Sequence, residues 1–277
     1  MRGVENPAPS LPWRWPGGLL GADDPEPVGH LRPDAPSSFL LICDHGGNLV
    51  PRGLADLGLE RQDLARHIAW DIGALDVGER LSEVLGAELI FQRYSRLVID
   101  CNRPPHEAEA FVERSDGTPI PGNAVLAPQD AARRVAEVFH PYHARIEAAI
   151  ERRLAAGRPP VIVSIHSFTP RHGERPAPRP WPVSLLFNRD PSFARALERA
   201  FARAGDTMVG MNEPYHVDDR GDYAIPYHAE RRGLPHVLLE LRQDLVATRH
   251  DAQAWADRVG AALDLALVGF RSREGAA

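Results

Sequence analysis

The sequence predicts an α/β protein in which a largely parallel sheet is covered by helices on both faces, giving three layers. Short apolar runs alternate along the chain with longer stretches whose apolar residues recur at helical spacing. This alternation is typical of parallel strands joined by crossover helices. The predicted strands are residues 39–43, 88–91, 96–101, 161–166, 183–187 and 236–241.

Four stretches between and after these strands are predicted to be helical. In the first, Leu64, Ile68 and Ile72 recur every four residues, as on the buried face of an amphipathic helix. Asp190 and Pro191 supply the cap and the first-turn proline of the third. The predicted helices are residues 61–85, 128–155, 191–204 and 251–268.

The chain is predicted to divide into an N-terminal arm and one larger domain. Residues 1–36 are rich in Pro and Gly and are expected to form an extended arm, whereas residues 37–277 carry all of the predicted strands and helices. With 277 residues, 43% of them apolar, the chain can bury one large core. Three connections, residues 102–127, 167–182 and 212–235, are long, and we expect them to be lids or binding loops.

Composition and charge exclude several classes of function. The formal net charge of -6 leaves no broad basic field, so we expect no nucleic-acid partner. All 32 basic residues are arginine, so the chain has neither a Schiff-base lysine nor a P-loop lysine. The N-terminus lacks the apolar core of a signal peptide, and no segment approaches the ~18 apolar residues of a membrane span. We therefore expect a cytoplasmic protein without a membrane partner.

Polar side chains gather at the ends of several predicted strands. Ligands of open α/β sheets bind beyond the carboxyl ends of the strands, where these side chains would meet. The candidates are Asp44 and His45 after the first strand, Asp100, Asn102 and Arg103 at the end of the third, His166 and Ser167 at the end of the fourth, and Glu240 and Arg242 in the last. A functional site is predicted at this sheet edge, because two histidines, an Asn-Arg pair and a glutamate would meet there.

The two strand-end histidines predict a zinc site. A catalytic zinc takes three protein ligands, commonly imidazole and carboxylate, and keeps one position for water. His45 and His166 would supply two nitrogens. The third ligand is expected to be Asp71, because an acid between apolar helix positions is costly to bury unpaired; Asp76 is the competing candidate. The two glycines after His45 would let the backbone pass close to a metal or a substrate.

Five segments together resemble the N-formylglutamate amidohydrolase family. They occur in the family's order between about residue 38 and residue 247, and the third is the most specific; they read DHGGNLVP, HIAWDIGA, SRLVIDCNRPP, SIHSFTP and HVLLELRQDL. The resemblance implies a mixed α/β sheet like that of zinc carboxypeptidases and aspartoacylases, with one bound zinc ion. It also implies a small-molecule substrate, an N-acyl acidic amino acid whose amide bond is hydrolysed, as in the release of formate and glutamate from N-formylglutamate.

One departure bears on the metal ligands. Zinc carboxypeptidases use a His-x-x-Glu pair, but Asn48 stands three residues after His45, and an amide is a poor zinc ligand. The carboxylate ligand must then come from elsewhere in the chain, which favours Asp71.

The remaining strand-end residues receive roles by their chemistry. Glu240 interrupts an apolar strand, where burial would raise its pKa to suit a general base; a structural ion pair with Arg242 or another arginine is the alternative. Arg103 is the first candidate to bind a substrate carboxylate, because guanidinium binds carboxylate through two hydrogen bonds. The further candidates for substrate binding are Asn102, Arg96 and Arg242, and His228 is the candidate for hydrogen bonding the oxyanion.

Other functions stay open at this point. Ser167 or Cys43 could act as a nucleophile beside a histidine, although the chain has no G-x-S-x-G elbow. The fold could also serve a protein that binds a metal or a small ligand without turnover, or a hydrolase of a different N-acyl amino acid or peptide.

Overall fold

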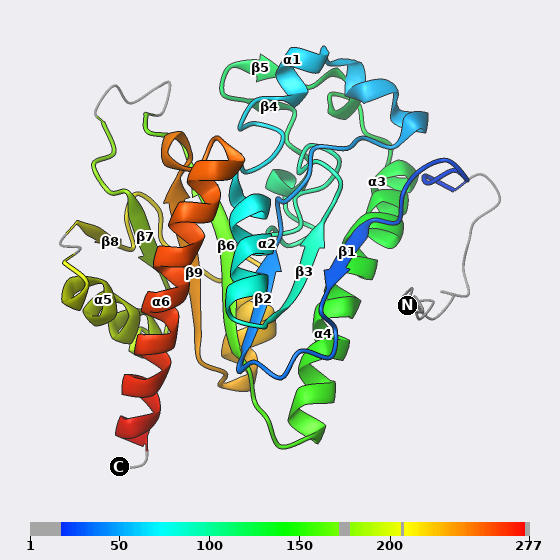
Figure 1. Ribbon diagram of the computed structural model, residues 1–277. Helices are drawn as coiled ribbons and strands as arrows, with labels where there is room; N and C mark the ends of the chain where they lie inside the picture. The colour runs from blue at the N-terminus through cyan, green and yellow to red at the C-terminus, as the bar shows by residue number, and fades with distance from the viewer. Residues whose placement is uncertain (1–17, 172–177, 206–207, 275–277) are drawn as a thin grey trace, which may run out of the picture.

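A mixed sheet forms the middle layer of the protein (Figure 1). This computed structural model describes residues 18–171, 178–205 and 208–274. Within these ranges the main sheet has seven strands in the order β1-β3-β2-β6-β9-β7-β8. The four central strands β3, β2, β6 and β9 are parallel, and β1 and β7 run antiparallel to β3 and β9. Their bounds are β1 Val28–Leu31, β2 Phe39–Cys43, β3 Glu88–Gln92, β6 Val161–Phe168, β7 Val183–Leu186, β8 Val209–Met211 and β9 His236–Arg242.

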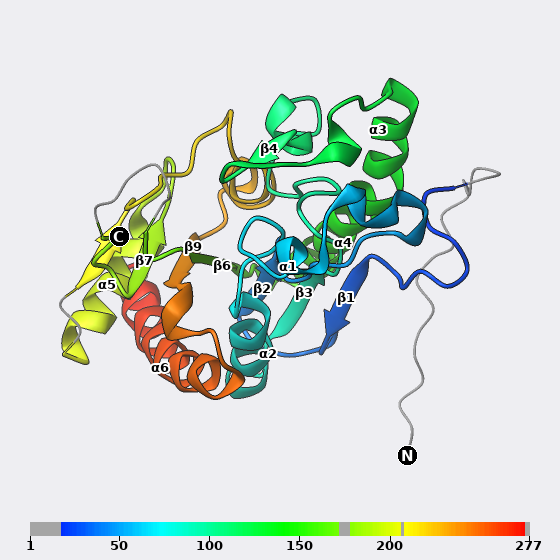
Figure 2. The same ribbon diagram turned by 90° about the horizontal axis from the view of Figure 1, so that it is seen from above.

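Helices cover both faces of this sheet, which confirms the predicted three-layer α/β class. Figure 2, the view from above, shows α2, α5 and α6 on one face, with α4 on the other. Successive side chains of a strand point to opposite faces, so Leu41 of β2 joins the core under α2, while Leu40 and Ile42 join the core under α4. The helix bounds are α2 Ala74–Val84, α4 His140–Ala155, α5 Ser192–Arg203 and α6 Arg249–Glu274.

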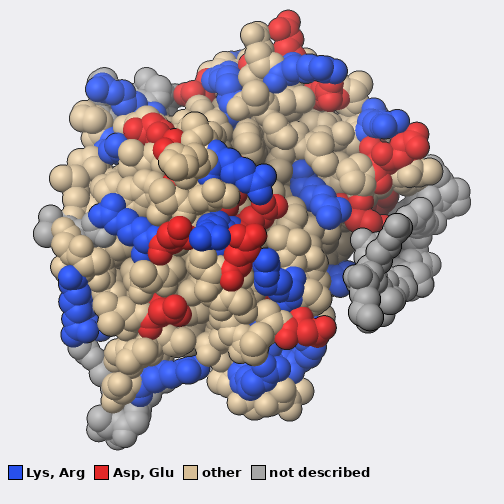
Figure 3. Space-filling view, in the orientation of Figure 1, with Lys and Arg blue, Asp and Glu red and all other residues tan. Residues whose placement is uncertain are grey.

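Charged side chains of both signs are interspersed on the face that carries α2 and α6 (Figure 3). Arg80 of α2 pairs with Glu83 on its own helix and with Asp257 of α6. Such exposed pairs contribute little to stability and mark a solvated surface. No helix in the described ranges is both long enough and apolar enough to cross a membrane.

The order of the strands brings the ends of β2 and β6 together. The chain leaves β2, passes through α1 (Arg61–Leu64) and α2, and returns in β3 on one side of β2. It then passes through α3 (Pro128–Arg134) and α4 and returns in β6 on the other side of β2. The connections therefore diverge at the carboxyl ends of β2 and β6, which is where open α/β sheets bind ligands.

The prediction of a strand at residues 96–101 is wrong. Leu97, Val98 and Ile99 are buried, but the chain turns there, since Val98 N donates to Ser95 O at 2.9 Å and Arg96 N to Ala69 O at 3.1 Å. The apolar run is buried, but its backbone amides are satisfied by hydrogen bonds within a turn and to neighbouring loops and not by a sheet partner.

The predicted helix 61–85 is broken into α1 and α2. Asp71 lies in the turn between them, so it does not occupy the helical position expected for it. Gly73 precedes α2 with φ of 80°, and a Cβ atom there would lie 2.1 Å from Val246 O. Only glycine fits both the conformation and the close approach.

Other observed elements agree with the predictions from the sequence or add structure to the predicted arm and connections. Residues 128–155 are helical throughout, with a π-helical turn η4 (Val135–Phe139) between α3 and α4. The predicted arm contributes β1 to the edge of the sheet, whereas residues 1–17 lie outside the described ranges. The long connection 102–127 carries a small hairpin of β4 (Arg114–Ser115) and β5 (Thr118–Pro119). Part of the connection 167–182, residues 172–177, is likewise not described.

Candidate active site

His45, Asp71 and His166 meet at the carboxyl ends of β2 and β6. One ligand atom from each lies within 4.8 Å of the others, and all three side chains are buried. Asp71 Oδ2 is 2.8 Å from His166 Nδ1 and 3.3 Å from His45 Nδ1. Asp76, the competing candidate, lies on α2 outside this group. The structure thus brings together the three residues predicted to bind zinc.

Backbone contacts place these three side chains. His45 lies two residues beyond the end of β2, and its carbonyl accepts a hydrogen bond from Asp71 N at 3.0 Å. His166 lies within β6, and Ser167 N donates to Asp71 Oδ2 at 3.3 Å. The glycines after His45 serve packing, because a Cβ atom on Gly47 would lie 2.0 Å from Arg93 O.

In each histidine, the ring nitrogen that points away from Asp71 is hydrogen-bonded to another carboxylate. His45 Nε2 lies 2.7 Å from Asp100 Oδ1, and His166 Nε2 lies 3.1 Å from Asp44 Oδ2. Since a carboxylate only accepts hydrogen bonds, each Nε2 carries a proton, and each Nδ1 faces a third carboxylate, that of Asp71. Carboxylate-histidine pairs of this kind orient the ligands of metal sites. The sequence pointed to both aspartates at strand ends but did not indicate this role.

The two outer carboxylates are themselves fixed by hydrogen bonds. Asp44 accepts from Tyr142 Oη at 2.9 Å and from Ser164 Oγ at 3.1 Å. Asp100 Oδ2 accepts from Arg96 Nε at 3.0 Å, and Asp100 Oδ1 accepts from a backbone amide. Their partners keep both carboxylates, and through them both rings, in one orientation.

The electrostatics of the group favour a cation at its centre. Burial and the charge of Arg96 act to lower the pKa of His45, but Asp100 and Asp71 outweigh them and raise it. Burial likewise opposes a charged His166, yet Asp44 and Asp71 raise its pKa well above the ordinary value. The carboxylates therefore draw positive charge onto the imidazoles. A divalent cation would satisfy the same field with both rings neutral.

Glu240 lies beside this group on β9. It is paired with His166 in the parallel register and keeps 8% of its surface exposed. Burial raises its pKa to about 7, opposed by the charge of His166 and supported by that of Asp71. Glu240 Oε2 has no hydrogen-bond partner among the described residues, and no ion pair there joins it to an arginine. The alternative of a structural ion pair is therefore not realised within the described chain.

The arginines predicted to bind substrate are ion-paired with aspartates of the protein. These pairs are Arg96 with Asp71 and Asp100, Arg103 with Asp222, and Arg242 with Asp244. Arg103 also donates to Gly221 O, and Asn102 binds the same loop, donating to Asp222 Oδ1 at 2.9 Å and accepting from Ala224 N at 3.0 Å. The Asn102-Arg103 pair thus anchors the loop that leads into the π-helical turn η5 (Ile225–Ala229).

His228 lies in η5 and is fully buried. His143 Nε2 donates to Cys101 O at 2.9 Å, so His143 Nδ1 accepts from His228 Nε2, also at 2.9 Å. This placement gives no support to the predicted contact of His228 with an oxyanion.

The residues considered as nucleophiles are held in other roles. Cys43 is fully buried, and burial followed by the charges of Asp71 and Asp44 raises its pKa well above the ordinary value. Ser167 Oγ donates to Ile72 O at 2.8 Å. A thiolate at Cys43 is therefore disfavoured, and the Ser167 hydroxyl proton is bound to the backbone.

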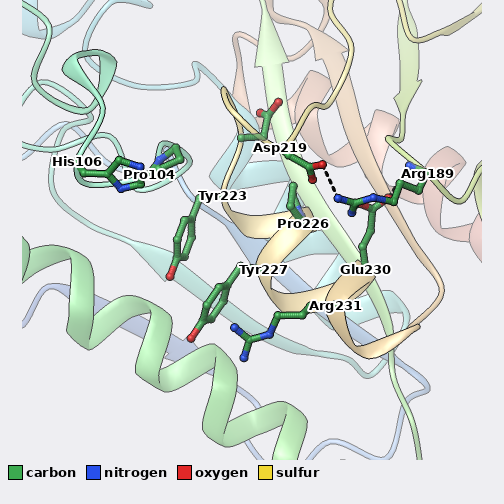
Figure 4. Close-up of a pocket in the computed structure, with 10 residues that line it drawn as sticks. Pro104, His106, Arg189, Asp219, Tyr223, Pro226, Tyr227, Glu230 and Arg231 are labelled. Carbon is green, nitrogen blue, oxygen red and sulfur yellow. Dashed lines mark hydrogen bonds and ion pairs between the residues drawn. The ribbon is translucent and has the colours of Figure 1, made fainter.

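A cavity of about 600 Å³ opens on the η5 side of the molecule. Figure 4 shows Tyr223 and Tyr227 side by side in it, with Arg231 next to Tyr227. Its lining does not include the His45, Asp71 and His166 group, but Asp222 lines it and also binds Asn102 and Arg103. The donor atoms that could hold a metal ion converge at the His-Asp-His group and not in this cavity.

Comparison with known proteins agrees with this fold and identifies the family. The family model of N-formylglutamate amidohydrolase matches residues 37–247. A gene product of Agrobacterium tumefaciens with a solved structure is 35% identical, with a TM-score of 0.86, over 91% of this chain and 99% of that chain. N-formylglutamate amidohydrolase from Ralstonia eutropha is 22% identical, with a TM-score of 0.66, over 90% of this chain and 99% of that chain, a likeness that shows the fold. No curated protein matches the chain. On the extent of the family match, the chain belongs to the N-formylglutamate amidohydrolase family and is a hydrolase of amide C–N bonds.

Proposed function

We propose that this protein hydrolyses the amide bond of an N-acyl acidic amino acid, with N-formylglutamate as the first substrate to test, and that it uses zinc. The observation that carries the proposal is the convergence of His45 Nδ1, Asp71 Oδ2 and His166 Nδ1 at a buried point. Two nitrogens and one carboxylate oxygen are the ligand set of several catalytic zinc sites, in which three protein ligands leave a position open.

The protein fits a zinc ion at this point. Asp44 and Asp100 hold the far nitrogens of the two rings, which keeps the near nitrogens directed inward. When bound, zinc would polarise the scissile carbonyl and make an attacking water more acidic.

Glu240 is proposed as the general base. Its unpartnered Oε2 is free to accept the proton that the attacking water releases, and the same oxygen can then pass that proton to the leaving nitrogen. The products are the free acid and the free amine, so one water is consumed and Glu240 returns to its starting state.

Metal content tests the proposal. Purified protein should carry close to one zinc per chain, and His45→Ala and His166→Ala should each lose it. Asp71→Asn should weaken zinc binding far more than the matched change Asp76→Asn on α2. If both histidine variants retain the full metal content, His45 and His166 are not metal ligands and the proposed site is wrong.

Substrate choice is tested on the zinc-loaded protein. N-formylglutamate should yield formate and glutamate in equal amounts, and a panel of other N-acyl amino acids should rank below it. A better N-acyl substrate that lacks an acidic side chain would change the proposed substrate class.

A further inference from the structure

A substrate carboxylate needs a cation that the protein does not already neutralise. The arginines that the sequence indicated for this task are each ion-paired with an aspartate, as described above for Arg96, Arg103 and Arg242. A guanidinium already paired with a carboxylate has part of its charge neutralised and fewer N–H donors left for a substrate carboxylate. The residue that binds a substrate carboxylate should therefore lie elsewhere at the same sheet edge.

Arg179 is held by the protein but paired with no carboxylate in the described chain. Its Nη1 donates to Thr169 O at 3.2 Å and to Thr169 Oγ1 at 3.0 Å. Its Cζ atom lies 4.8 Å from the ring centroid of Tyr215 and 5.9 Å from that of Phe168. Two aromatic rings and a buried threonine thus hold the guanidinium in a set orientation while its charge stays available.

The segment that carries Arg179 lies at the edge of the sheet where the candidate active site is. Arg242 N donates to Pro182 O at 3.0 Å, and Arg242 Nη1 donates to Arg179 O at 3.2 Å, so the segment runs along the end of β9, two residues past Glu240. Thr169 follows the end of β6, three residues past His166.

Tyr215 lies beside Arg179, with its ring centroid 4.8 Å from Arg179 Cζ. Burial raises the pKa of Tyr215, the charge of Arg179 opposes this rise and the charge of Glu240 adds to it. Phe168, the second ring next to Arg179, lies two residues past His166 on β6, so its side chain points to the same face of the sheet as that of His166. Tyr215 also keeps 42% of its surface exposed, so the ring beside Arg179 is in contact with solvent.

We propose that Arg179, packed against Tyr215, binds a carboxylate of the substrate and so sets the preference for an acidic N-acyl amino acid. The inference rests on the proposed function, because that function supplies the carboxylates. N-formylglutamate has two, one on the α-carbon and one on the side chain. Arg179 would bind one of them through two parallel hydrogen bonds.

Binding measurements test this without relying on turnover. The zinc-loaded proteins would carry Glu240→Gln, so that the substrate is bound but not hydrolysed, with residue 179 either wild type or changed to alanine. Each would be titrated calorimetrically with N-formylglutamate and with its two monoamides, N-formylglutamine and N-formylisoglutamine. The wild type should bind one monoamide at least roughly 10²-fold more weakly than the diacid, and Arg179→Ala should bind that monoamide and the diacid within about threefold of each other. The monoamide affected identifies the carboxylate. Arg179→Lys should recover part of the preference, which also shows that the site still folds.

A control variant and a hydrolysis assay separate the possible failures. Arg195→Ala, an exposed change on α5, should retain the wild-type preference. If Arg179→Ala keeps the wild-type discrimination against both monoamides, or if no protein binds the diacid, the inference is overturned. If the proteins bind with the expected discrimination but the wild type does not hydrolyse the substrate, the proposed function is contradicted. Arg179 would still be the residue that binds the carboxylate.

Discussion

His166 on β6 and Glu240 on β9 are directly paired in the parallel ladder, and their side chains share the face of the sheet that packs against α4. Neighbouring residues of paired strands point to the same side, so the proposed metal ligand and the proposed base are adjacent whatever the surrounding loops do. A pair set by strand register is more rigid than one set by two loops.

Removing the base should abolish turnover without removing the metal. Glu240→Gln keeps the shape of the side chain but cannot take a proton from water, so kcat should fall by about 10²-fold to 10⁴-fold. Zinc content, measured by atomic absorption, should equal that of wild type. Loss of zinc together with activity would instead assign Glu240 to the metal site, and unchanged kcat would exclude it as the base.

Neutralising the outer carboxylates should weaken metal binding. In Asp44→Asn and Asp100→Asn, the amide no longer fixes the proton on the Nε2 atom of His166 or His45, and zinc affinity should fall by about 10-fold to 100-fold. Competition with a chelator measures this change. Asp257→Asn, which removes a carboxylate paired with Arg80 on the surface, is the control and should bind zinc like wild type. Equal affinities in all three variants would show that the outer carboxylates do not support the ligands.

A Cβ atom at Gly73 should destabilise the turn that carries Asp71. Gly73→Ala combines a positive φ with a Cβ atom 2.1 Å from Val246 O, whereas Gly157→Ala has a positive φ and open space. Gly157→Ala should cost ~1 kcal/mol of unfolding free energy, and Gly73→Ala at least ~2 kcal/mol more, because the backbone must shift. Urea unfolding compares the two. A similar cost for both would show that the contact relaxes without strain.

Stability should fall in mild acid because His143 is buried as the neutral form. Burial lowers the pKa of His143 to about 4; the charge of Asp44 and the bond to Cys101 oppose this, and His140 adds to it. The pKa of the ring rises again on unfolding, so between about pH 6.5 and pH 4 the unfolded chain binds more protons. The stabilisation is complete above pH 6.5 and is lost as pH falls towards 4, by up to about 3 kcal/mol.

Denaturant unfolding at several pH values measures this slope. His143→Gln keeps a donor for Cys101 O and should reduce the slope, whereas His250→Gln, an exposed change on α6, should retain it. His228 shares the bond and also has a lowered pKa, so part of the slope should survive in His143→Gln. An identical slope in His143→Gln and wild type would rule out His143 as its source.

The sequence by itself determined the class of fold and the residues that meet at the site. Apolar runs at strand spacing predicted β2, β3, β6, β7 and β9, because a strand covered on both faces must be apolar along its length. Polar residues that end or interrupt such runs are conspicuous, which is why His45, His166 and Glu240 could be found without coordinates. Asp71 was found by its chemistry, although the helix assumed around it is broken.

Only the tertiary structure decided the partners of these side chains. An apolar run records burial but not backbone conformation, so residues 96–101 were taken for a strand where the buried chain turns. The pairing of Asp44 with His166 and of Asp100 with His45 joins residues far apart in the chain, and no local pattern specifies it. The same holds for the arginines. A sequence shows that Arg103 carries a charge, but only the folded chain shows that Asp222 already neutralises it, whereas Arg179 is held between aromatic rings with no acid beside it in the described chain.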